Sequence, residues 1–141
     1  MGSNTCEIRV GRLMEIRLDH GFPSIADVER MDVTIGAAFA TIPNNVNVVV
    51  AADWRRTQLM ADGASDRFAK MIGSYNARIQ RSAAVANAEA PVNVLQFMRL
   101  IRESNHPQRK LFHDVASLVL YLGDVLTPPE LARLREFLGA T

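Results

Sequence analysis

The sequence predicts an α/β protein built on a mostly parallel sheet of about five strands. Residues 46–54 form a short apolar run with three consecutive valines between polar neighbours, which is typical of a strand buried on both faces in the middle of a sheet. Around this run, segments with strand and helix periodicity alternate along the 141 residues. Such alternation predicts parallel strands joined by right-handed crossovers.

The segments before the central strand predict an antiparallel hairpin at the sheet edge, followed by a helix. Residues 7–10 and 13–19 are separated by Gly11-Arg12, and polar and apolar residues alternate in the second segment, as in a strand with one wetter face. Ser24 is expected to cap a helix that ends before Pro43. One stripe of that helix is apolar at helical spacing: Ile25, Val28, Met31, Ile35, Ala38, Phe39 and Ile42.

After a polar loop from Arg55 to about Ala64, the pattern predicts a helix, a short strand and another helix. The first of these helices has an apolar stripe and contains Gly73, which predicts a close contact; the stripe is Ala64, Phe68, Met71, Ile72, Tyr75 and Ile79. Residues 82–87 have small side chains and predict a strand. Pro91 suits the first position of the next helix, whose expected inward residues are Val92, Leu95, Met98 and Ile101.

The remaining residues predict one more strand and two helices. Residues 110–113 form the strand, and Asp114 is expected to cap the helix that buries Val115, Leu118, Val119, Leu122 and Val125. Residues 127–130 have the capping-box arrangement with prolines in the first turn, so they start a last helix that ends at Gly139.

The last helix, at about residues 127–138, is too short to be stable alone and must bury its stripe of Leu131, Leu134 and Leu138. It either covers its own sheet or packs against a second copy around a two-fold axis. Because Phe137 adds apolar surface beside the stripe, the sequence favours a homodimer.

Composition narrows the class of protein. The 16 basic and 15 acidic residues are dispersed, which gives no electrostatic case for nucleic acid or an anionic membrane as a partner. No apolar run approaches the ~18 residues that a membrane span needs. A lone cysteine, Cys6, and the lack of a signal-peptide pattern predict a reducing, cytoplasmic setting.

The order of elements and several phrases resemble the STAS-type domains related to anti-sigma factor antagonists, and more closely their shorter, SpoIIAA-like bacterial relatives. The resemblance rests on the opening strand pair, the strand that ends at Asp53, the passage Ile79-Gln-Arg-Ser-Ala-Ala-Val and the passage Lys110-Leu-Phe-His-Asp. It covers about residues 7–126 of a single domain of residues 1–141. It implies a sheet wound as a βα superhelix, a regulatory or binding role and no chemistry of its own.

In the phosphorylated branch of that family, a strand-end Asp is followed by a serine that a kinase modifies at the start of the next helix. Asp53 matches the acid, and Ser65 lies where the phosphoacceptor would be, although residues 62–66 depart from the family motif. A serine at a helix start also serves as a cap, which is the favoured interpretation of Ser65. An Asp at a strand end also forms turns.

The candidate binding residues follow the central strand: Asp53, Trp54, Arg55, Arg56 and Thr57. Functional groups of open α/β sheets gather at the carboxyl ends of strands. An indole beside two guanidinium groups can stack on or clamp an anionic ligand, and it can equally belong to a solvated loop that the Trp anchors. Both interpretations stay open.

The histidines give weaker signals. His113 and Asp114 are adjacent and suggest an acid–base pair, but a strand-end His beside a helix cap is the favoured interpretation. His20, His106 and His113 have no ligand spacing, so the sequence predicts no metal site. It also lacks a Gly-rich phosphate loop and a nucleophile elbow, so we expect no enzyme activity and no cofactor.

Three hypotheses for the function follow. The first is a regulatory or binding module that acts through the loop after Asp53 and the following helix, with a protein partner. The second is a small protein that binds an apolar or anionic ligand with the same loop. The third is a receiver-like domain with Asp53 as phosphoacceptor, for which Asp19 is the only early acid and Lys110 starts its strand instead of ending it. A closed pocket at the loop favours a ligand, and a flat loop favours a protein partner.

Overall fold

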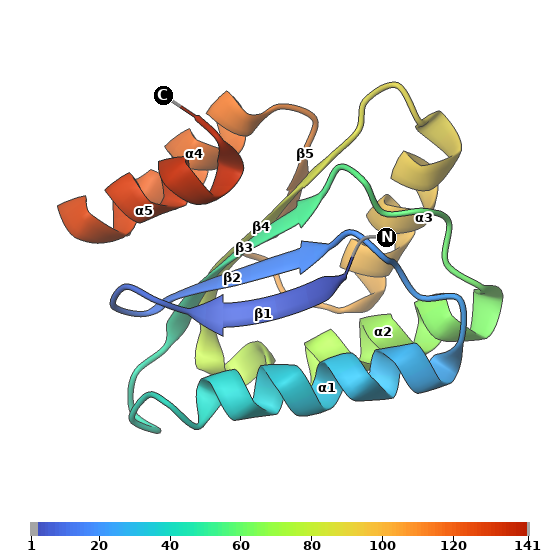
Figure 1. Cartoon of the computed structure of the whole chain (residues 1–141), viewed down its shortest axis with the longest axis horizontal. Helices are drawn as coiled ribbons and strands as arrows, with labels where there is room; N and C mark the ends of the chain where they lie inside the picture. The colour runs from blue at the N-terminus through green and yellow to red at the C-terminus, as the bar shows by residue number, and fades with distance from the viewer. Residues whose placement is uncertain (1–2, 141) are drawn as a thin grey trace.

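The computed structural model of the protein describes residues 3–140 and contains one five-stranded sheet (Figure 1). The strands lie side by side in chain order: β1 (Asn4–Ile8), β2 (Leu13–Leu18), β3 (Val48–Trp54), β4 (Ile79–Ala86) and β5 (Arg109–Phe112). β1 is antiparallel to β2, and every later pair is parallel. The predicted α/β class, mostly parallel sheet and edge hairpin are confirmed, although β1 begins earlier than residue 7.

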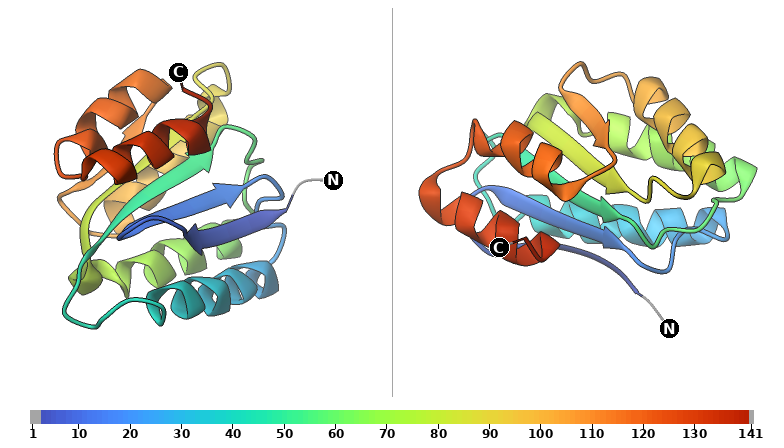
Figure 2. Two further views of the ribbon diagram at one scale, coloured as in Figure 1. Left: turned by 60° about the vertical axis from the view of Figure 1, so that its left-hand side comes forward. Right: turned by 90° about the horizontal axis from the view of Figure 1, so that it is seen from above.

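Helices cover both faces of the sheet (Figure 2). α1 (Ile25–Phe39), α2 (Asp62–Gly73) and α3 (Pro91–Glu103) connect successive parallel strands and pack together on one face. Because each crossover has the same hand and each new strand adds to the same edge, the three helices must share that face. α4 (Val115–Gly123) and α5 (Pro128–Leu138) follow the last strand and cover the opposite face. No helix of residues 3–140 is long and apolar enough to cross a membrane.

The central strand is buried at all seven positions, as predicted, and it begins at Val48. Its side chains alternate between the two layers. Val50 and Ala52 join the apolar cluster beneath α1, α2 and α3, whereas Val49 and Ala51 join the cluster beneath α4 and α5. The strand therefore carries both cores, which explains why it is apolar on both sides.

The start signals of three helices are confirmed. Asp114 caps α4 by accepting a hydrogen bond of 2.7 Å from the Ser117 amide. Thr127 and Glu130 form the reciprocal capping box of α5, and Pro91 is the first residue of α3. Each of these signals consists of a few adjacent residues, so its effect on the helix start does not depend on distant parts of the chain.

The inward stripe predicted for α3 is wrong at three of its four positions, and only Ile101 packs partly against the core. Val92, Leu95 and Met98 are 61%, 66% and 51% exposed. The helix instead buries Val94, Phe97 and Leu100. Its rotation is set by long-range packing, since the Phe97 ring meets the Trp54 ring edge-on at 5.2 Å.

The predicted second helix is too long. α2 ends at Gly73, where a side chain would come within 3.0 Å of the Ser104 carbonyl, so the predicted close contact is confirmed. A 3₁₀ turn at Asn76–Arg78 follows, and Ile79 starts β4 instead of continuing the helix. The β4 strand therefore begins three residues before the sequence predicts.

The last helix covers its own sheet. Leu134 and Leu138 are buried against residues of β2, β3 and α4, and Phe137 is buried beside them. The apolar surplus on which the homodimer prediction rested is therefore used within the chain. Association with a second copy stays a prediction without that support.

Candidate functional site

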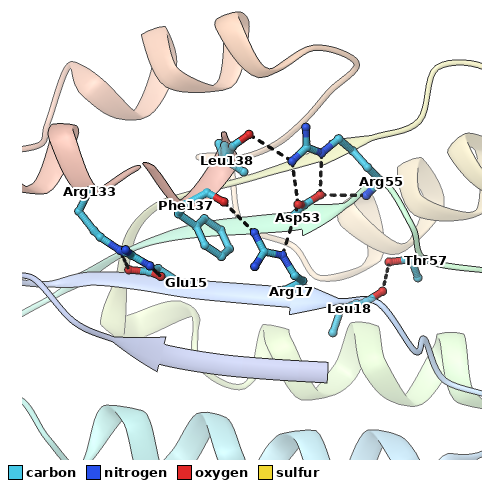
Figure 3. Close-up of polar contacts among 9 residues, drawn as sticks. All are labelled: Glu15, Arg17, Leu18, Asp53, Arg55, Thr57, Arg133, Phe137 and Leu138. Carbon is cyan, nitrogen blue, oxygen red and sulfur yellow. Dashed lines mark hydrogen bonds and ion pairs between the residues drawn. The ribbon is translucent and has the colours of Figure 1, made fainter. Parts of the chain in front are cut away.

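Asp53 lies near the carboxyl end of β3, on the face that α5 covers, and is 7% exposed. Arg55 donates two hydrogen bonds of 2.9 Å to its two carboxylate oxygens and a third from its backbone amide at 3.1 Å (Figure 3). Arg17 Nε approaches the same carboxylate at 3.5 Å. Burial opposes ionisation, but these hydrogen bonds and charges outweigh it and hold the pKa of Asp53 below its usual value.

The two arginines that flank Asp53 also hold the end of α5. Arg17 donates to the Phe137 carbonyl at 2.7 Å, and Arg55 donates to the Leu138 carbonyl at 3.3 Å (Figure 3). The last carbonyls of a helix lack partners within the helix and carry the negative end of its dipole, so cations are favourable there. Asp53 therefore orients the cations that fasten the last helix.

A second ion pair joins the middle of α5 to β2. The Glu15 carboxylate accepts two hydrogen bonds of 2.8 Å from Arg133 (Figure 3). Glu15 is buried, so the face of residues 13–19 that alternation predicts to be wetter lies under α5. The predicted alternation of β2 is confirmed. The predicted solvent exposure of this face is wrong, because the helix that covers it lies far away in the sequence.

The start of α5 is tied to the β1–β2 turn by Glu130. Its carboxylate accepts from the Arg12 amide at 2.8 Å and from the Thr127 amide at 2.9 Å. Burial opposes its ionisation, but these backbone bonds hold the pKa of Glu130 below its usual value. Gly11 has a φ of +57° and a Cβ there would clash with the Glu130 carboxylate, so only glycine suits this turn.

Trp54 does not share a surface with Arg55 and Arg56. Consecutive strand residues point to opposite faces, so Trp54 lies in the core beneath α2 and α3, buried against Phe68 and Phe97. A clamp made by Trp54 together with the two arginines is therefore ruled out by the geometry. Its indole Nε1 has no hydrogen-bond acceptor among the described residues.

The loop between β3 and α2, residues 55–61, is held against the protein by hydrogen bonds. Thr57 Oγ1 donates to the Leu18 carbonyl at 2.7 Å (Figure 3). The Asn93 side chain donates to the Thr57 carbonyl. The side-chain amide of Gln96 accepts a hydrogen bond from the backbone N–H of Met60 and donates one to the backbone carbonyl of Met60, each at 2.9 Å. The backbone of the loop is thus fixed to the start of α3.

Several side chains of this fixed loop reach solvent, among them Leu59 and Arg56. Leu59 is 50% exposed, and Arg56 is exposed next to Arg55. Arg56 also lines a surface hollow of about 620 Å³ together with Arg17, Asp19 and the end of α5. The hollow carries charges of both signs, so it offers a polar surface and no strong preference for one sign.

Ser65 is not the helix cap that the sequence favours. α2 starts at Asp62 after Ala61, and the Ser65 amide already donates to the Ala61 carbonyl at 2.9 Å. Ser65 is half-buried within the first turns of the helix. A phosphate on Ser65 would therefore find its own amide occupied, unlike a phosphate at a cap.

Among the histidines, His106 occupies a structural position. His106 Nε2 lies 2.8 Å from the Ile79 carbonyl, and its Nδ1 accepts from the Gln108 amide at 3.0 Å. His113 is exposed at the end of β5 beside the Asp114 cap. Within residues 3–140, no group of three His, Cys, Asp or Glu side chains is placed to hold a metal ion.

Comparison of the chain with protein-family models, with curated proteins and with solved structures finds no match. The function must therefore be argued from the site.

Proposed function

We propose that this chain is a non-enzymatic, STAS-like regulatory module that binds a protein partner through the loop of residues 55–61 and the start of α2. The observation that supports this most is the combination of a rigid loop with a half-exposed Leu59 at its centre. An apolar side chain presented on a fixed backbone loses little entropy on binding. Such side chains are typical anchors of protein interfaces.

The start of α1 extends this surface. Ile25 is half-exposed, and its Cδ1 stands 3.3 Å from the position that a Cβ on Gly63 would take. α1 and α2 therefore begin side by side at the carboxyl edge of the sheet. The resulting surface joins Ile25 of α1 with Leu59 and Arg56 of the loop, which suits a protein partner better than a small molecule.

Two acids that the sequence singles out, Asp53 and Asp114, are engaged in holding the fold. Asp53 is neutralised by Arg55 and Arg17, and Asp114 caps α4. A nucleophile or general base needs a free pair of electrons directed at a substrate. These engagements support binding over catalysis, and they disfavour Asp53 as the phosphoacceptor of a receiver-like domain.

Binding of an anionic ligand at the same loop is a weaker alternative. Arg17 and Arg55 already contact Asp53 and the carbonyls of α5, so an anion would have to replace bonds of 2.7 to 2.9 Å. Arg56 alone is a single exposed cation, and one exposed ion pair contributes little affinity.

Affinity capture with matched variants tests the proposal. Leu59→Arg should abolish capture of a protein from lysate of the native cell, because it places a charge in the centre of the interface. Leu120→Arg changes a side chain that is 80% exposed on α4, on the other face, and should capture the same protein as the wild type. Identical capture by both variants would contradict the proposed surface.

A further inference from the structure

A small cavity lies inside the layer beneath α1, α2 and α3. It has a volume of about 40 Å³, room for about three water-sized groups. The sheet floor of the cavity includes the small side chains Ala52, Ser82 and Ala84, which leave space beneath the helices. Trp54 lines one part of it, and its buried Nε1 finds no acceptor among the residues that the structure describes.

Arg109 lines another part of the cavity and is 5% exposed. Its guanidinium donates to the Asn76 side chain at 2.8 Å, to Ser104 Oγ at 2.9 Å and to the Ile72 carbonyl at 3.3 Å. These partners are all neutral, and no carboxylate within residues 3–140 pairs with it. An unpaired buried cation is costly. Burial accordingly lowers the pKa of Arg109 to about 10.

A groove of about 280 Å³ opens on the surface between α3 and the edge strand β5. Met98, Ile101 and Leu111 make it apolar, and Arg102 and Arg109 add positive charge. Lys110 and His113 complete the lining, which contains no acidic residue. The groove thus combines an apolar floor with a positive potential.

Ile101 and Arg109 line both the groove and the cavity, so they form the wall between them. Along β4, Arg109 pairs with Ser82 and Trp54 pairs with Ala86. Four residues at about 3.3 Å each separate these positions by roughly 13 Å. A ligand that passes Ile101 would extend from the groove toward Trp54.

We propose that the groove and the cavity bind a small amphiphilic carboxylate, an alkyl-chain acid whose head lies at Arg102 and Arg109 and whose tail passes Ile101 toward Trp54. The head supplies the anion that Arg109 lacks within the protein. The tail follows the apolar floor, and its end fills the empty space above Ala84. Ligand pockets commonly combine such an apolar lining with a few polar groups that fix orientation.

Trp54 is the only tryptophan, so its fluorescence reports directly on the cavity. Decanoate, added to the full chain below the concentration at which it forms micelles, should produce a saturable change in emission. Decan-1-ol should bind more weakly because it lacks the charge, and acetate should have no effect because it lacks the tail. Equal responses to decanoate and decan-1-ol would overturn the assignment of the head, and a response to acetate would overturn that of the tail.

Two charge reversals give a matched test. Arg102 and Lys70 both lie in the last turn of their helices, α3 and α2, so the change to Glu disturbs the helix dipole equally. Arg102→Glu should weaken decanoate binding at least about tenfold, because a charge-assisted contact becomes a repulsion. Lys70→Glu should leave it unchanged. Equal loss in both variants would reveal a general effect of net charge and overturn the site.

The position of the tail is tested separately. Ala84→Val adds two methyl groups to the cavity and should weaken binding of decanoate more than that of hexanoate, whose shorter tail ends before Ala84. Equal weakening of both acids would contradict the path of the tail. If Ala84→Val fails to fold, the comparison of Arg102→Glu with Lys70→Glu still decides the proposal.

Discussion

Glu15 on β2 and Arg133 on α5 are 118 residues apart in the chain and face each other through two hydrogen bonds of 2.8 Å. Both side chains are largely buried. The pair joins the last helix to the sheet at its middle, between the Glu130 contact at its start and the Arg17 and Arg55 contacts at its end. α5 is therefore held along its whole length by polar contacts as well as by its leucine stripe.

Breaking this pair should destabilise the protein strongly. Glu15→Ala leaves the largely buried Arg133 with only its pair with the exposed Glu136, so we expect a loss of about 2 kcal/mol in the free energy of unfolding by urea. Glu7→Ala breaks the exposed pair of Glu7 with Arg9 and serves as control, with no measurable change expected. A Glu15 variant as stable as the Glu7 variant would show that α5 is not held by this contact.

Removal of the last helix should unfold the chain. Truncation after Leu126 uncovers Leu13, Val49 and Ala51, which α5 and α4 bury. Circular dichroism should show loss of cooperative unfolding, and the full-length protein should sediment as a monomer. A folded truncated chain derived from a full-length dimer would instead restore the homodimer prediction.

Asp53 should contribute stability that depends on pH. Its pKa in the folded protein is lowered, so the contribution is complete above the unfolded value of about 4 and is lost as the pH falls below it. Asp53→Asn should lower the free energy of unfolding near neutral pH and flatten its decline between about pH 4 and pH 2. A residual slope is expected, because the pKa of Glu130 is lowered too. An unchanged slope in urea titrations at several pH values would refute the role of Asp53.

Two glycine substitutions distinguish the cost of backbone strain from the cost of a clash between side chains. Gly11 and Gly139 both have positive φ, at +57° and +71°, but only at Gly11 would a Cβ meet another group, the Glu130 carboxylate. Gly139→Ala should cost about 1 kcal/mol from the backbone alone. Gly11→Ala should cost more in the same thermal or urea unfolding measurement. Equal losses would mean that the β1–β2 turn moves freely away from Glu130.

The parts of the fold that the sequence predicts well depend on local chemistry. The caps at Asp114 and Thr127 and the apolar run of β3 are each contained in a few adjacent residues. The rotation of α3 could not be predicted, because two apolar sets repeat in it at the same spacing and only contact with the distant Trp54 chooses between them. Long-range packing overrides periodicity there.

The candidate site, too, was predicted only where its residues are close together in the sequence. Asp53 and Arg55 are near neighbours, and the structure brings them together. Arg17, Arg133 and Glu15 were missed as a group because their partners come from the other end of the chain. The sequence does contain a pattern that indicates this contact. Glu15 and Arg17 lie on one face of an alternating strand, and the last helix carries Arg133.

Site-specific photo-crosslinking tests the proposed interface most directly. A photoreactive residue replaces Gln58, which is exposed in the loop of residues 55–61, or Leu120, which is exposed on α4. After irradiation in the native cell, the Gln58 variant should form an adduct with one protein, identified by mass spectrometry, and the Leu120 variant should not. Absence of an adduct at position 58, or the same adduct at both positions, would contradict a partner-binding role for this loop.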